Sequence, residues 1–203
     1  RYIWEKDHAV DYGIDFYAPQ TLLTPDGRRV MIGWMQNWDT CNLHTQSIPW
    51  FGQMSLPREL SVKNGRLYQQ PLRELEALRE EKVEYRDVVF TDNLTLDGVK
   101  GRCVDLELTI HPADSAGFYE FAVRFAQNEE FHTSMSYRPR ESVLKIDRKF
   151  SGSRRAIVHQ RRCLLEQTAA ENEEQGTPGE LRLRVILDRY SCEVFAEDGA
   201  KVM

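Results

Sequence analysis

The strongest constraint on the fold of this chain is a period-two alternation of apolar and polar residues in its second half. Apolar residues occupy every other position in 104–110, 121–125 and 181–185. Successive side chains of a β-strand point to opposite faces of a sheet, so the alternation predicts strands with one buried face each. Shorter runs at 143–146 and 192–195 continue the series, at spacings typical of an antiparallel β-sandwich. We therefore predict a sandwich over residues 83–203, with the period-two pattern starting at Val83.

Two β-hairpins are predicted before this region. Pro25-Asp26-Gly27 separates two apolar runs, because proline presets φ and glycine accepts a positive φ. Asn64-Gly65 does the same between residues 60–62 and 66–68. The run 30–34 hardly alternates, which indicates a strand covered on both faces.

One helix is predicted, over residues 71–79. Pro71 would take the first helical position, and Leu72, Leu75 and Leu78 would form one narrow apolar stripe. A helix of about three turns with so narrow a stripe suits a linker lying across a domain junction. The alternative is a loop with an accidental leucine spacing. The predicted division is residues 1–70, a linker at 71–82 and the sandwich at 83–203.

Composition narrows the class of protein. Hydrophobic residues make up 41% and charged residues 29%, as in ordinary soluble globular chains. A net charge of −5 and the lack of a Lys/Arg stripe argue against a nucleic-acid partner. Since no apolar run reaches the roughly 20 residues of a membrane-spanning helix, we expect no membrane partner.

The four cysteines, at positions 41, 103, 163 and 192, are widely spaced and have no histidine at ligand spacing. We expect no metal and no cofactor. Cys103 and Cys192 lie in strand-like runs, which favours buried free thiols and a reducing cytoplasm. Two disulfides are the alternative.

The stretch from Asp11 to Leu60 is the candidate site. All four tryptophans lie before residue 51, beside carboxylates and amides. Aromatic faces suit the C–H surfaces of a sugar, and polar side chains suit its hydroxyls.

The same stretch carries ordered motifs. These are Asp11-x-Gly13-x-Asp15-Phe16-Tyr17-Ala18-x-Gln20, Gly33-Trp34-x-x-x-Trp38 and Gly52-x-Met54-Ser55-Leu56-Pro57-Arg58-Glu59-Leu60. The tail adds Leu187-Asp188-Arg189-x-Ser191-x-Glu193-Val194-Phe195-x-x-Asp198-Gly199. In these motifs the chain resembles glycoside hydrolase family 32, the invertases, sucrose-6-phosphate hydrolases, levanases and inulinases.

The resemblance implies a five-bladed β-propeller joined by a short helix to a β-sandwich. Residues 1–70 would be its last blade or blades, 71–82 the linker and 83–203 a sandwich truncated at its C-terminal end. Both ends of the chain look like cuts through structure, so we expect a fragment. An open blade edge would favour self-association of that fragment.

The resemblance also implies a retaining hydrolysis of terminal β-D-fructofuranosides, such as sucrose, sucrose 6-phosphate or fructans. The family nucleophile lies in an Asn-Asp-Pro-Asn motif, its transition-state stabiliser in Arg-Asp-Pro and its acid/base glutamate in Glu-Cys. This chain has none of the three in place. We therefore expect no catalytic residue in it, and no activity from the chain alone.

Four residues are candidates for contacts with the sugar: Tyr17, Trp38, Asp15 and Trp34. The alternative for each is a packed structural residue, and Trp34 in particular would point into the blade. Asp11 and Asp15 need not face each other in a strand-and-turn context, so we do not assign them as a catalytic pair.

Arg58 and Glu59 are predicted to form a structural pair that closes the last blade.

Two other functions are compatible with the sequence. The chain could be a carbohydrate-binding module that binds fructan without cleaving it, or a structural interaction domain built on the sandwich. Calorimetry with sucrose, fructose and levan separates a module, which binds alone, from a cut propeller, which does not.

Overall fold

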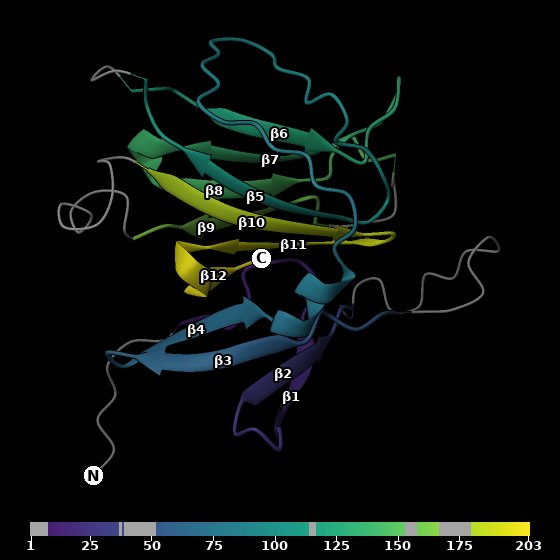
Figure 1. Ribbon diagram of the computed structural model, residues 1–203, viewed down its shortest axis with the longest axis vertical. Coiled ribbons are helices and arrows are strands. Elements are labelled where there is room, and N and C mark those ends of the chain that lie inside the picture. The colour runs from purple at the N-terminus through teal and green to yellow at the C-terminus, as the bar shows by residue number, and fades with distance from the viewer. Residues whose placement is uncertain (1–7, 37, 39–51, 114–116, 153–157, 167–179) are drawn as a thin grey trace.

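The computed structural model describes residues 8–36, 38, 52–113, 117–152, 158–166 and 180–203. Within these residues the regular structure is almost entirely antiparallel β-sheet, with three short 3-10 helices (Figure 1). The strands form three four-stranded sheets. The all-β prediction is confirmed.

The first sheet has the order β1-β2-β3-β4 and comprises β1 (Tyr17–Leu23), β2 (Arg29–Trp34), β3 (Arg58–Lys63) and β4 (Arg66–Pro71). Both predicted hairpins are present, and Asn64 and Gly65 have φ of 51° and 76°, as a tight two-residue turn requires. Val30 and Met31 are adjacent and both buried, which confirms that β2 is covered on both faces.

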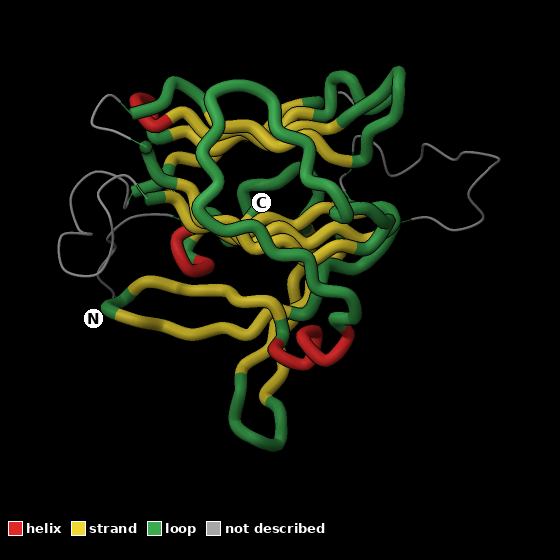
Figure 2. Tube along the Cα trace, turned by 45° about the horizontal axis from the view of Figure 1, so that its top comes forward, coloured by secondary structure: helices red, strands yellow, loops and turns green. Residues whose placement is uncertain are grey.

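The remaining strands form two sheets that pack face to face. The inner sheet has the order β12-β11-β10-β5, from β5 (Val104–Ile110), β10 (Leu181–Asp188), β11 (Ser191–Ala196) and β12 (Lys201–Val202). The outer sheet has the order β6-β7-β8-β9, from β6 (Phe121–Phe125), β7 (Thr133–Arg138), β8 (Val143–Asp147) and β9 (Gln160–Leu164). Figure 2 shows the inner sheet between the outer sheet above it and the first sheet below it.

The main core lies between the inner and outer sheets. The outer sheet contributes Met135, Tyr137 and Leu144, and the inner sheet contributes Leu183 and Val194, all almost fully buried. These residues alternate with exposed or half-buried ones along several of the strands, which accounts for the period-two pattern in the sequence.

The period-two pattern starts later than predicted. Residues 80–103 carry no strand, although Val83 was expected to begin one. Val89 and Phe90 in this segment are 76% and 47% exposed, so their consecutive apolar side chains do not line a single buried face. The strand pattern begins instead at Val104.

The linker helix is also shorter than predicted. It is a 3-10 helix, η1 (Arg73–Leu78), and Pro71 is the last residue of β4, paired with Arg58, rather than the first helical residue. Leu78 is 75% exposed and no residue of η1 is fully buried, so the leucine stripe packs only in part. Ion pairs hold this region to the inner sheet instead, including one from Arg79 to Asp105 at 2.7 Å. In the part of the chain described here, no helix has the length and apolar character needed to cross a membrane.

Candidate functional site

Three of the four predicted site residues form one aromatic cluster at the open end of the β1–β2 hairpin, opposite its turn. The ring centroids of Tyr17 and Trp38 are 5.3 Å apart, those of Trp34 and Trp38 are 6.2 Å apart and those of Tyr17 and Trp34 are 6.3 Å apart. All three contacts are edge-to-face, the favoured geometry for aromatic pairs. Trp38 is 65% exposed and Tyr17 is 46% exposed, so two of the three side chains are open to solvent.

Strand pairing places these rings together. Tyr17 lies directly opposite Trp34 in the β1–β2 register, and an irregularity in β1 follows Tyr17. On its other side Trp34 bridges Met54, which precedes β3. Ser55 holds the backbone next to Trp34. Its hydroxyl accepts the N–H of Gly33 at 3.0 Å, and its own N–H donates to the Gly33 carbonyl at 2.8 Å.

Asp15, the fourth predicted residue, contacts the sandwich. Its Oδ2 lies 3.9 Å from Nη1 of Arg148, the residue after β8. Asp11 takes a different arginine, Arg58, at 2.9 Å. Asp11 and Asp15 thus form ion pairs with different arginines.

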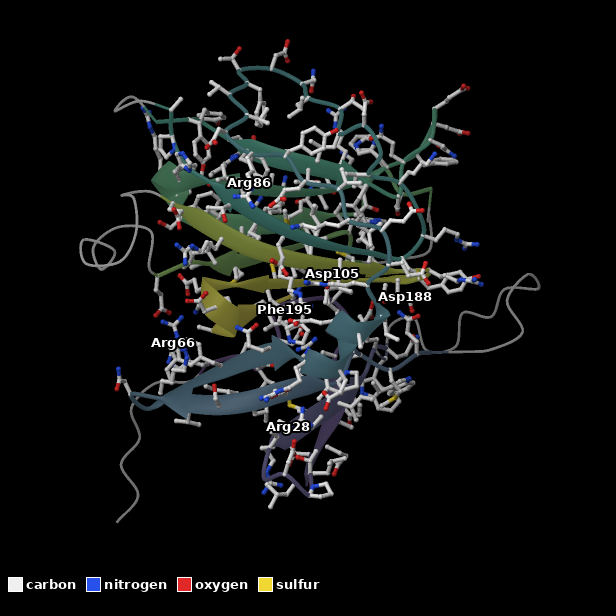
Figure 3. All side chains as sticks on the ribbon, in the orientation of Figure 1. Arg28, Arg66, Arg86, Asp105, Asp188 and Phe195 are labelled. Carbon is white, nitrogen blue, oxygen red and sulfur yellow. The ribbon has the colours of Figure 1, made fainter. Side chains whose placement is uncertain are left out.

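Arg58 lies at the centre of a buried charge cluster that joins the first sheet to the sandwich. Its side chain is 1% exposed, and it binds carboxylates whose side chains are 5% (Asp11) and 1% (Glu193) exposed. The Glu193 Oε2 accepts the Arg58 Nε at 3.0 Å and Nη2 at 2.6 Å. The guanidinium also lies 4.6 Å from the Phe16 ring centroid and 5.6 Å from that of Phe195, within cation–π range. Phe195 lies at the boundary between the inner and first sheets (Figure 3).

The two carboxyls of this cluster titrate abnormally. Burial raises the pKa of Asp11 and of Glu193, because it disfavours their charged forms, and the Arg58 guanidinium opposes that rise. Arg161 also lowers the pKa of Asp11 by its charge. Desolvation is the larger effect for both carboxyls, so the pKa of each lies above its usual value despite the nearby guanidinium.

The predicted pairing of Arg58 with Glu59 is wrong. Adjacent residues of a strand point to opposite faces, so Arg58 turns to the sandwich and Glu59 turns away from it. Glu59 binds Arg73 at 2.6 Å and Arg28 at 2.9 Å (Arg28 is labelled in Figure 3). Hydrogen bonds from Arg73 lower the pKa of Glu59 to about 2.

Sequence reasoning did not find Glu193. One signal was available, since Glu193 is a charged residue between Cys192 and Val194, both of which pack on the sandwich core. A carboxylate in such a run, if buried, needs a cationic partner.

The cysteine prediction was wrong for Cys103, which is exposed and lies just outside β5. Cys103, Cys163 and Cys192 are free thiols, and Cys41 lies outside the described residues. Among the described residues, the histidines, cysteines and carboxylates form no group of three or more that could hold a metal ion.

Comparison with known proteins gives the family. Residues 3–71 match the model described as the glycosyl hydrolases family 32 N-terminal domain, and residues 74–203 match the family 32 C-terminal model. Because the second match alone covers well over half of the chain, the chain belongs to glycoside hydrolase family 32.

Individual relatives agree with this assignment. The chain is 32% identical over 196 residues to the sucrose-6-phosphate hydrolase of Staphylococcus xylosus, covering 97% of this chain and 37% of the relative. It is 32% identical over 198 residues to the raffinose invertase of Escherichia coli, covering 94% and 36%. The sucrose-6-phosphate hydrolase of Lactobacillus gasseri has the same fold, with a TM-score of 0.72 at 24% identity over 95% of this chain and 36% of that chain. The chain thus spans a little over a third of these relatives.

Proposed function

We propose that this chain is part of a retaining glycoside hydrolase that cleaves terminal β-D-fructofuranosides, and that it supplies one wall of the sugar pocket. The observation that carries the proposal is the cluster of Tyr17, Trp34 and Trp38, in which Tyr17 and Trp38 are exposed, in a chain that belongs to family 32. Exposed edge-to-face rings are suited to the C–H faces of a sugar, and relatives of this chain are named for sucrose 6-phosphate and raffinose.

The proposed reaction needs two carboxyl groups about 5–5.5 Å apart, which this chain does not supply in the family motifs. One carboxylate forms a bond to the fructosyl C2 while the C2–O bond to the leaving group breaks, and the acid protonates the leaving oxygen. Water then attacks C2, returns its proton to the acid/base glutamate and releases the carboxylate. Both groups would come from the protein upstream of residue 1.

The first sheet is proposed to be a propeller blade, with residues 1–70 in the propeller and 83–203 in the sandwich. In support, all seven residues of β1 are exposed, including Leu22 at 55% and Leu23 at 60%. An edge strand with exposed leucines is suited to cover by a neighbouring blade, and in the isolated chain it would favour self-association. The free thiols favour a cytoplasmic protein.

The test compares the 203-residue chain with a longer chain extended by its upstream coding sequence. We expect the extended chain to hydrolyse sucrose, sucrose 6-phosphate or levan, and the shorter chain to be inactive. Hydrolysis by the shorter chain would refute the placement of the catalytic carboxyls outside it. Calorimetric binding of levan by the shorter chain, together with no hydrolysis by the longer one, would favour a binding module instead.

A further inference from the structure

Two chain segments that flank the aromatic cluster both reach the sandwich. Residues 11–17 lead into β1 and end at Tyr17, and residues 52–58 lead into β3 and flank Trp34 through the Trp34–Met54 bridge. Neither segment is a regular strand along its whole length, so contacts other than the Tyr17–Trp34 strand pairing help to fix where the rings lie.

One carboxylate of the sandwich fixes the second segment. Glu193 Oε1 accepts the Leu56 N–H at 2.6 Å, while Oε2 accepts Nε and Nη2 of Arg58. Leu56 follows Ser55, whose hydroxyl and amide hold Gly33, the neighbour of Trp34. A short series of hydrogen bonds therefore leads from β11 to the cluster.

The same arginine fixes the first segment. Arg58 Nη1 binds Asp11 Oδ2 at 2.9 Å, and Asp11 Oδ1 accepts the Gly13 N–H at 2.7 Å. The Phe16 ring lies against Gly33, where any Cβ would collide with it, and beneath the Arg58 guanidinium. Tyr17 follows Phe16 directly, so this stack holds the backbone from which the Tyr17 ring projects.

We infer that Glu193, through Arg58, is a positioning residue for the Tyr17–Trp34–Trp38 cluster. The inference deepens the proposed function, because it makes a residue of the sandwich part of what shapes the sugar site. Net stability is a weak reason for such a cluster, since buried ion pairs can often be replaced by apolar residues without loss. Its geometry does what an apolar contact could not, because it sets directional bonds to both segments at once.

A second ion pair across the same boundary provides a matched control. Arg66, next to the turn between β3 and β4 (labelled in Figure 3), binds Glu197 at 2.7 Å. Glu197 is as well buried as the central carboxylates, with a side chain 4% exposed. Arg66 pairs with Lys63 at the turn end of the β3–β4 hairpin, whereas Arg58 pairs with Pro71 at its other end, so this ion pair joins the two parts of the protein away from Arg58.

The test compares Glu193→Gln with Glu197→Gln in the 203-residue chain, with the tryptophans at 4 and 50 replaced by phenylalanine. Trp34 and Trp38, with ring centroids 6.2 Å apart, should give an exciton couplet in far-ultraviolet circular dichroism that depends on their geometry. We expect Glu193→Gln to reduce the couplet by about half or more in the folded protein, and Glu197→Gln to leave it unchanged. A wild-type couplet in folded Glu193→Gln, or equal losses in both variants, would overturn the inference.

A second variant keeps the test decisive if Glu193→Gln does not fold. In the triple variant Asp11→Asn, Arg58→Met, Glu193→Leu, neutral side chains of similar size replace the whole cluster, a change that buried ion pairs commonly tolerate. Loss of the couplet in this folded variant supports the positioning role, and a wild-type couplet refutes it.

Kinetics of the extended chain test the link to sugar binding. We expect Glu193→Gln to raise KM about three- to tenfold, the scale of a weakened aromatic contact, with kcat changed less than about twofold. A fall in kcat at constant KM would contradict this part. An inactive extended wild type would defeat the proposed function and leave the couplet result standing, because the couplet is measured without sugar.

Discussion

Replacement of Arg58 by methionine should be among the most damaging single changes in this chain. Methionine approximates the length of the arginine side chain but carries no charge. It leaves Asp11 and Glu193 buried, with side chains 5% and 1% exposed, and removes the cation that both bind. It also removes the guanidinium that lies over the Phe16 ring.

The expected loss follows from the burial of these groups. Removal of one partner from a buried ion pair costs about 3–5 kcal/mol of unfolding free energy, because an uncompensated charge remains. For chains of about this length, 1 kcal/mol shifts the melting midpoint by about 2–4 °C. Arg58→Met should therefore lower the midpoint by roughly 6–20 °C at neutral pH.

The loss should shrink in acid. Burial raises the pKa of Asp11 and of Glu193 in the folded state above the value in the unfolded state. The folded protein therefore gains stability when these carboxyls are protonated at low pH, and it loses that stability as the pH rises through the raised pKa. The charge of Arg58 counteracts that rise, and its removal widens the difference. The difference in unfolding free energy between wild type and Arg58→Met should therefore narrow as the pH falls from neutrality through the raised pKa of these carboxyls.

Urea denaturation followed by circular dichroism at several pH values measures this gap. The control is Arg138→Met, which removes ion pairs to Glu120 and Glu141 whose side chains are 28% and 51% exposed. Such surface pairs contribute about 0–1 kcal/mol, so the control should lose little. The reasoning fails if Arg58→Met costs less than about 1 kcal/mol, or if its cost does not fall with acid.

Three further predictions concern single positions. Gly199→Ala should cost about 3 kcal/mol in urea denaturation, since φ is +88° and a Cβ would collide with the backbone of β4. Gly65→Ala, at φ +76° with open space around it, should cost only about 1 kcal/mol, and equal losses would contradict the collision. In a variant with Cys41 changed to serine, Cys103 should react with a thiol reagent at least about tenfold faster than Cys163, because Cys103 is exposed and burial raises the pKa of Cys163 to about 11. Equally fast reaction of Cys163 would disprove this. Trp38→Ala, at a 65% exposed position, should raise KM of the extended chain about three- to tenfold but lower stability by less than about 1 kcal/mol, and an unchanged KM would remove Trp38 from the site.

Strands were predictable where one face is apolar and the other polar, as in β5 and β10. Two strands of the outer sheet were missed for the opposite reason. In β7 the buried residues include Thr133 and Ser136, so polarity along the sequence does not report burial. In β9 the residues are Gln-Arg-Arg-Cys-Leu and the buried one is Cys163, too little to show a period. Both strands are held by pairing with β8, which a local pattern does not reveal.

In the candidate site, too, features that depend on local sequence could be predicted and long-range contacts could not. Tyr17 and Trp38 could be singled out because they lie in recognisable motifs, whereas Trp34, which was expected to point into the blade, packs against both of them. The partner of Arg58 could not, because Glu193 is 135 positions away and the nearest carboxylate in sequence, Glu59, lies on the other face of the strand. Local charge spacing favours the neighbour, whereas the alternation of side chains along a strand excludes it.

Strand β11 explains why the two parts of the chain depend on each other. Its side chains alternate between Cys192, Val194 and Ala196 in the sandwich core and Glu193 and Phe195 against Arg58 of the first sheet. A strand covered on both faces cannot lose one cover without exposing either apolar surface or an unpaired charge. The inner sheet is therefore a shared middle layer, and the first sheet should unfold together with the sandwich rather than before it.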